Sequence, residues 1–155
     1  MTIRPATEDD LSILARLKPH VHNMHAEALP DRFFYQTEED ARQEFERLQD
    51  RDNMQTIIVE YEDKPVGYLL MSFLHRPASN QLRKLDVLYI NQIAIHPDYR
   101  RKGCGHVLIK AAKDLARERN MDAMELSVWL FNQAGVTFFE SEGFKPESQR
   151  MIMEM

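Results

Sequence analysis

The chain has 155 residues, of which 43% are hydrophobic and 29% are charged, and its formal net charge is −5. This length is enough for one substantial hydrophobic core, so residues 1–155 are expected to form a single domain. The acidic balance disfavours general nucleic-acid binding, because polyanions are held by basic surfaces. Apolar runs such as residues 67–71 are far shorter than the ~20 residues of a membrane helix, and residues 1–4 are no secretory leader. A cytoplasmic protein is therefore expected.

The chain contains a single cysteine, Cys104. One cysteine cannot form an internal disulfide, so nothing in the sequence calls for an oxidising compartment. No catalytic base lies near Cys104 in the sequence, and we therefore interpret it as a small buried side chain rather than a nucleophile.

The first third of the chain predicts a strand and two helices. Residues 2–5 fit a short strand, and residues 7–10 resemble an N-terminal cap before leucines at helical spacing. Residues 20–32 are polar and contain a proline, which predicts an irregular segment. The aromatic residues 33–35 follow it, and a helix is expected over about residues 37–49. Together these segments are expected to form a helical flap.

Three apolar runs then predict strands. Residues 55–61 and 66–74 are rich in Ile, Val, Leu and Tyr, and the turn at residues 62–65 makes them an antiparallel hairpin. The third run, residues 87–95, ends at a His-Pro pair, where proline stops strand pairing.

The last third alternates between helix and strand patterns. Apolar residues at spacings of three and four predict a helix over about residues 105–119. Alternation of apolar and polar residues predicts a strand over residues 124–130, and Asn132 then begins a short helix that ends at Gly143. Residues 151–155 are interpreted as a closing strand. The order of elements predicts an α/β domain with a mixed sheet covered by helices.

One basic, glycine-containing loop carries the chemistry. Residues 100–105, Arg-Arg-Lys-Gly-Cys-Gly, follow a strand and open a helix, so unpaired amides and the helix dipole favour an anion there. The basic side chains match a pyrophosphate better than a single carboxylate. The alternative is an ordinary turn with solvated basic residues. No Gly-x4-Gly-Lys-Ser/Thr occurs, and Leu108 occupies the place of a third Rossmann glycine, so neither ATP nor NAD is indicated.

This loop and its neighbours resemble the GNAT superfamily of N-acetyltransferases. Arg100, Gly103 and Gly105 match the family's cofactor loop, and residues 89–97 are similar to its fourth strand, whose main chain pairs with the pantetheine arm. The segment from Asn132 to Gly143-Phe144 and the opening residues 3–10 extend the resemblance over nearly the whole chain. It implies a sheet in which the parallel fourth and fifth strands splay apart. It also implies that acetyl-CoA is bound by Ile93, Ala94, Ile95, Arg100, Arg101, Lys102, Gly103, Cys104, Gly105, His106, Asn132 and Phe139.

The resemblance further implies that an amine attacks the thioester directly, with a main-chain amide near Ile93 stabilising the oxyanion. The sequence departs from the family where many members carry a proton-donating tyrosine, because the matching residue is Phe139. The thiolate of coenzyme A, with a pKa near the ~8.5 of cysteine, leaves without much help. Phe139 is therefore expected to pack against the cofactor arm.

The general base is also missing from its common place on the fourth strand, which holds Tyr89 and Asn91. A lysine-like amine of pKa ~10.4 must lose a proton near pH 7.4, at a cost of about 4 kcal/mol. Tyr89 and Asn91 are candidates for positioning a water molecule, and Glu27, His25 and Asp31 are candidates for the base. Tyr89 also fits an ordinary strand aromatic.

The acceptor remains open among the primary amines of small molecules, peptides and proteins. His20, His22 and His25 match no zinc signature, so no metal site is expected. These histidines and residues 33–35 either line the acceptor pocket or form a surface turn, and Trp129 either touches the acceptor or packs. The acidic residues of the flap, which hint at a cationic acceptor or form a solvated face, are Glu27, Asp31, Glu38, Glu39 and Asp40.

The predicted function is thus N-acetyl transfer from acetyl-CoA to a primary amine. A non-catalytic acyl-CoA sensor or regulatory module is the alternative, because the cofactor residues are present while the family's acid and base are absent. Exposed strand-like segments such as residues 151–155 would also allow a homodimer.

Overall fold

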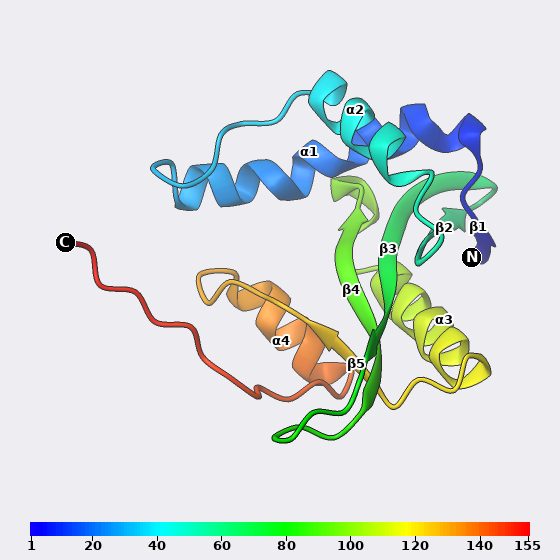
Figure 1. The fold of residues 1–155 in the computed structure, drawn as a ribbon. Coiled ribbons are helices and arrows are strands. Elements are labelled where there is room, and N and C mark those ends of the chain that lie inside the picture. The colour runs from blue at the N-terminus through cyan, green and yellow to red at the C-terminus, as the bar shows by residue number, and fades with distance from the viewer.

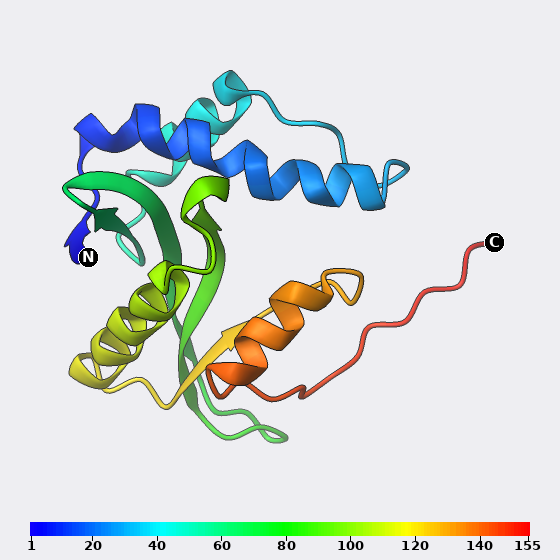
Figure 2. The same cartoon turned by 180° about the vertical axis from the view of Figure 1, so that it is seen from behind.

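The computed structural model describes residues 1–155 and shows one five-stranded sheet with helices on both faces (Figures 1 and 2). The strands follow the order β1-β2-β3-β4-β5, and only the pair β4–β5 is parallel. The strands are β1 (Thr2–Pro5), β2 (Met54–Tyr61), β3 (Lys64–Arg76), β4 (Leu85–Ile95) and β5 (Ala123–Leu126). The helices are α1 (Leu11–Ala28), α2 (Glu38–Leu48), α3 (Cys104–Glu118) and α4 (Gln133–Ser141), with short 3₁₀ turns at Glu8–Asp10 and Pro97–Tyr99.

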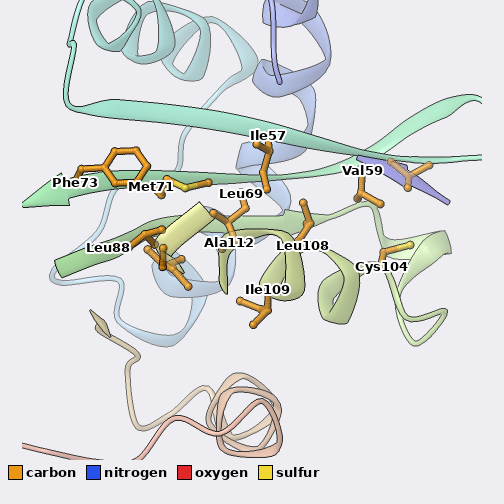
Figure 3. Close-up of a cluster of buried hydrophobic side chains, with 13 residues drawn as sticks. Ile57, Val59, Leu69, Met71, Phe73, Leu88, Cys104, Leu108, Ile109 and Ala112 are labelled. Atoms are coloured by element: carbon orange, nitrogen blue, oxygen red, sulfur yellow. The ribbon is translucent and has the colours of Figure 1, made fainter. Parts of the chain in front are cut away.

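The central strands bury both faces because successive side chains point to opposite sides of a sheet. On β3, Leu69 and Met71 face α3, whereas Tyr68 and Leu70 face α1 and α2. Figure 3 shows the larger core, in which Leu108 of α3 and its neighbours meet side chains of the middle strands. This burial on both faces explains why the middle strands have nearly continuous apolar sequences.

A bulge in β4 changes which side chains face which layer. Leu70 of β3 pairs with Gln92, but the next residue, Met71, pairs with Ile90, so Asn91 is the extra residue. Ile90 packs in the α3 core, whereas Ala94, four residues later, lies in the core under α1 and α2. The bulge therefore reverses the alternation of β4 and gives Asn91 an exposed position.

Strands β4 and β5 diverge after the bulge. Their parallel pairing ends at Ile90 opposite Leu126. Beyond that point, residues 92–95 of β4 pair only with β3. The splayed parallel strands that the sequence predicts are confirmed, as is the mixed α/β sheet.

The predicted hairpin is confirmed, with a tighter turn than expected. Glu62 and Asp63 have φ angles of 49° and 59°, and Tyr61 pairs directly with Lys64. Two left-handed residues match the right-handed twist of the flanking strands.

Helix α1 corrects the prediction of an irregular segment at residues 20–32. The helix continues to Ala28 although Pro19 removes one of its backbone hydrogen bonds. Val21 packs against the core under α1 and α2, and the side chain of Ala26 is fully buried. These contacts extend the apolar stripe beyond Pro19, so tertiary packing outweighs the polar composition of the segment.

Two strand predictions in the last third are wrong, one in its length and the other altogether. The strand expected over residues 124–130 ends at Leu126, because β4 has already diverged and no other strand lies beside β5. Residues 151–155, predicted to close the sheet, form no strand and pair with nothing. No helix is long and apolar enough to cross a bilayer.

Candidate active site

A cavity of about 910 Å³ lies where β4 and β5 diverge. Its walls come from α1, the segment before α2, the end of β4, the start of α3 and the segment between β5 and α4. Ile93 and Ile95 line it from the stretch of β4 that has no partner on the β5 side. Backbone groups on that side remain free to pair with an extended ligand.

The start of α3 forms one end of the cavity. Gly103 caps the helix with a φ of 84°, a left-handed conformation that glycine adopts without steric cost. The amides of residues 104–106 donate to no backbone carbonyl. The cavity wall here comprises Arg100, Arg101, Gly103, Cys104, Gly105 and His106. Free amides, the helix dipole and two arginines together make this end suited to phosphate groups.

Two contacts hold this end in shape. The Nε of Arg100 donates to the carbonyl of Ile95 at 3.3 Å and so ties the loop to the end of β4. A Cβ atom on Gly105 would lie 2.9 Å from the ring of Phe138. Glycine at this position therefore allows α4 to approach α3 closely.

Helix α4 supplies the opposite wall. Its N-cap is Asn132, whose side-chain oxygen accepts the amide of Gly135 at 3.0 Å. Phe138 and Phe139 both line the cavity. At the far end of α4, the buried carboxylate of Glu142 lies 2.8 Å from His106 Nδ1.

A polar network surrounds Glu44 at the other end of the cavity. The carboxylate accepts a hydrogen bond from Lys18, from Gln36 Nε2 at 3.0 Å and from Gln92 Nε2 at 3.2 Å. The hydroxyl of Tyr68 donates to Gln92 Oε1 at 3.0 Å, and burial raises the pKa of Tyr68, so it stays a neutral donor. The side-chain oxygen of Gln36 is buried without a partner.

Lys18 is the cation of this network. Burial is the larger cause and repulsion from Arg47 the smaller one that lower the pKa of Lys18 to about 8. Contact with the Glu44 carboxylate acts in the opposite direction and favours the charged ammonium. Lys18 and Glu44 thus form a partly desolvated ion pair on the cavity wall.

A cluster of aromatic side chains forms a further part of the cavity wall. The ring of Phe33 lies 5.4 Å from that of Trp129 and 5.6 Å from that of His25. His25 also meets Phe131 at 5.5 Å, and His22 meets Phe33 at 6.0 Å. The cluster joins α1 and the segment after it to the segment between β5 and α4.

Comparison with known proteins identifies the family. Residues 20–144 match the Acetyltransferase (GNAT) family. The chain belongs to this family. It is 31% identical over 144 residues to an uncharacterised N-acetyltransferase of Methanocaldococcus jannaschii, covering 93% of the chain and 60% of that relative. The chain thus spans less than two thirds of that relative's length.

Solved structures share the GNAT fold. A mutant form of a Bacillus halodurans protein superposes with a TM-score of 0.94 at 24% identity, covering 100% of this chain and 99% of that one. The aminoglycoside N-acetyltransferase AAC(6')-Iy, in complex with the bisubstrate analogue CoA-S-monomethyl-acetylneamine, superposes with a TM-score of 0.75 at 18% identity. That match covers 99% of this chain and 96% of the other.

Most of the residues predicted to hold the cofactor lie on one cavity of this GNAT chain. The exceptions are Ala94, whose side chain is buried in the core under α1, and Lys102. The Nζ atom of Lys102 lies 5.0 Å and 5.3 Å from the ring centroids of Tyr99 and Tyr61. Cys104 is buried, and burial raises the pKa of its thiol, which fits the interpretation as a packed side chain.

The structure separates the catalytic candidates. Asn91 and His25 line the cavity. Tyr89 does not, and its hydroxyl instead donates to Ser127 Oγ at 3.0 Å. Glu27 faces a small separate pocket, and Asp31 is exposed on the segment after α1.

The other residues predicted to lie in the flap also fall into two groups, according to whether they line the cavity. Phe33 and His22 line the cavity, whereas His20, Phe34 and Tyr35 do not. Trp129 lies on the cavity wall. None of the predicted acidic flap residues reaches the cavity, and the acidic residues on its wall are Glu44 and Glu142 instead. No group of three His, Cys, Asp or Glu side chains is arranged to hold a metal ion.

Sequence reasoning missed the network around Glu44, although a signal was available. Ala41, Phe45 and Leu48 form the inward stripe of α2, and Glu44 stands at position i+3 on that stripe. Lys18 similarly follows the buried Leu17 on α1. Two charges on facing apolar stripes indicate a paired, partly buried site.

Proposed function

We propose that this chain is an N-acetyltransferase that moves an acetyl group from acetyl-CoA to a primary amine of a small molecule or peptide. The observation that carries the proposal is one continuous cavity joining the amide-rich start of α3, the free edge of β4 and a polar, aromatic end. Acetyl-CoA supplies an activated acyl thioester when bound. The bisubstrate complex of the related aminoglycoside acetyltransferase supports both a coenzyme A donor and a small-molecule amine acceptor.

The residues fit this donor in three parts. Arg100, Arg101 and the amides of residues 104–106 would hold the pyrophosphate, and the free edge of β4 around Ile93 would pair with the pantetheine arm. Phe139 packs edge-to-face against Phe144 with ring centroids 5.8 Å apart and turns an apolar surface to the cavity. The arm is thereby held at the point where β4 and β5 diverge.

The acceptor would enter at the aromatic end. Phe33 and Trp129 provide apolar walls there. His25 is the sequence-predicted candidate base on the cavity wall, and Asn91 is the candidate there for positioning a water molecule that relays the amine's proton. Ser72 donates to the side-chain oxygen of Asn91 at 2.7 Å and fixes its orientation.

The experiment measures coenzyme A release with a thiol-reactive dye, using acetyl-CoA and a panel of alkylamines, polyamines, aminoglycosides and peptides. We expect thiol release with at least one amine class and none without amine. Binding of acetyl-CoA in the absence of turnover for every amine would contradict the enzyme and favour an acyl-CoA-binding module. Absence of both binding and turnover would contradict the cofactor site itself.

A further inference from the structure

The acidic groups on the cavity wall are already paired. They are Glu44 and Glu142. The Glu44 carboxylate contacts the ammonium of Lys18 and accepts hydrogen bonds from two glutamine side chains. Glu142 lies near the start of α3, where its carboxylate contacts His106 and Lys113 and its side chain is only 7% exposed. No carboxylate on this wall is therefore left free to hold a second ammonium group of the acceptor.

A positive charge stands beside the aromatic part of the wall. The guanidinium carbon of Arg32 lies 5.7 Å from the centroid of the Trp129 ring, and the arginine side chain is always charged. Glu27, near the end of α1, faces the small separate pocket and not this cavity. A second ammonium group on the acceptor would thus meet a like charge and no free anion, and both effects oppose its binding.

Two aromatic rings form a corner on the cavity wall. The rings of Phe33 and Trp129 are 5.4 Å apart and nearly perpendicular, at 84°. Both residues line the cavity, and Trp129 remains 37% exposed. A flat ring placed in such a corner can stack on one wall and meet the other edge-to-face, which are the two arrangements that aromatic pairs prefer. The corner therefore fits an aromatic group better than a charged chain.

The corner lies beside the candidate base. In both views the end of α1, which carries His25, lies across from the segment between β5 and α4, which carries Trp129 (Figures 1 and 2). The ring of His25 is 5.6 Å from that of Phe33. Its Nδ1 is 3.0 Å from the carbonyl oxygen of Val21, which can only accept, so Nε2 is the nitrogen free to take a proton. An amine that gives its proton to His25 thus carries its substituent toward the aromatic corner.

We propose that the acceptor is an arylalkylamine, a primary amine joined to an aromatic ring and carrying no second positive charge, which rests on the proposed function and names its substrate class. The ring would occupy the corner of Phe33 and Trp129, and the amine would face His25 and the free edge of β4. The acidic flap residues that hint at a cationic acceptor do not act on this choice, because none of them lines the cavity.

Three amines test this substrate class in the thiol-release assay. Phenethylamine carries the ring, pentylamine lacks it, and putrescine replaces the terminal methyl group of pentylamine with a second amine. We expect kcat/KM for phenethylamine to exceed that for pentylamine about tenfold, because of the added ring contacts. Putrescine should fall at least about tenfold below pentylamine, because its second ammonium finds no free carboxylate.

The outcomes separate the substrate class from the activity. Putrescine or an aminoglycoside that equals or exceeds phenethylamine would overturn the arylalkylamine assignment and leave the proposed function intact. Equal values for phenethylamine and pentylamine would overturn it as well. Absence of thiol release with every amine would contradict the proposed function itself.

Variants of the corner test where the ring binds. Trp129→Ala and Phe33→Leu each remove one aromatic wall, and in both we expect the preference for phenethylamine over pentylamine to fall from about tenfold toward one. The affinity for coenzyme A, measured by calorimetry, should stay unchanged, whereas a general loss of structure would lower it. Phe34→Ala is the matched control, because Phe34 is 92% exposed and does not line the cavity, and it should keep the full preference. A preference that survives in both corner variants would overturn the proposal.

Discussion

Gly103 shows how much one residue can decide at this site. Its left-handed backbone caps α3, and it lines the end of the cavity that is rich in amides. Gly103→Asp adds a negative charge where phosphates would approach, and we expect binding of coenzyme A to become undetectable by calorimetry. Gly103→Asn adds a similar volume without charge, and asparagine tolerates this conformation, so it should retain weakened binding. Unchanged affinity in the aspartate variant would place the phosphates elsewhere.

Asp10 gives a second prediction at the residue scale. Its carboxylate pairs with Arg4 through contacts of 2.7 Å and 2.8 Å. This pairing is the main cause that lowers the pKa of Asp10 to about 2, and a hydrogen bond from the amide of Thr7 adds to it. Because the pKa is lowered, the ionised Asp10 carboxylate stabilises the fold at pH values above its ordinary pKa of 3.8. That contribution is lost as the pH falls toward 2.

The Asp10→Asn variant isolates this effect. Because Arg4 is partly exposed, we expect a loss of roughly 1–2 kcal/mol at pH 7. Urea unfolding should show the difference between the two proteins shrinking as the pH falls from 4 to 2. A difference that stays constant with pH would assign the loss to the capping hydrogen bonds alone.

At the scale of elements, α4 depends on its cap more than the other helices do. It has nine residues and no fully buried side chain, so packing alone stabilises it weakly. Asn132→Ala removes the acceptor for the Gly135 amide and should cost about 1 kcal/mol.

The expected result of Asn132→Ala is faster amide exchange throughout α4 and weaker binding of coenzyme A, because Phe138 and Phe139 lose their fixed positions. Asn132→Ser keeps a capping oxygen and serves as the control, with exchange close to that of the unaltered protein. Equal exchange in both variants would show that the cap does not hold the helix.

The ion pair between Lys18 and Glu44 matters at the scale of the whole molecule, because it joins α1 and α2 over the sheet. Glu44→Ala leaves the buried ammonium of Lys18 without its anion, and we expect a loss of roughly 2–3 kcal/mol. The double variant Lys18→Met/Glu44→Leu removes both charges and should recover most of that stability. Denaturant unfolding measures the stability of both variants. Equal losses in the single and the double variant would mean that the unpaired charge of Lys18 is not the cause of the destabilisation.

The sequence by itself determined the elements whose signals are local. Runs rich in Ile, Val, Leu and Tyr on either side of a turn predicted the hairpin, spacings of three and four predicted α3, and Gly103 with its basic neighbours predicted the loop that opens α3. Residue chemistry and short-range periodicity are enough for these features, because each depends on neighbours within a few positions along the chain.

Only the tertiary structure decided the features that depend on distant neighbours. Packing on the sheet carried α1 past Pro19, and the divergence of β4 ended β5 at Leu126. Folding also paired Lys18 with Glu44 from separate helices, and it excluded Tyr89 and Glu27 from the cavity. These outcomes follow from which surfaces meet, and a linear pattern of residues contains no information about the partner across the contact.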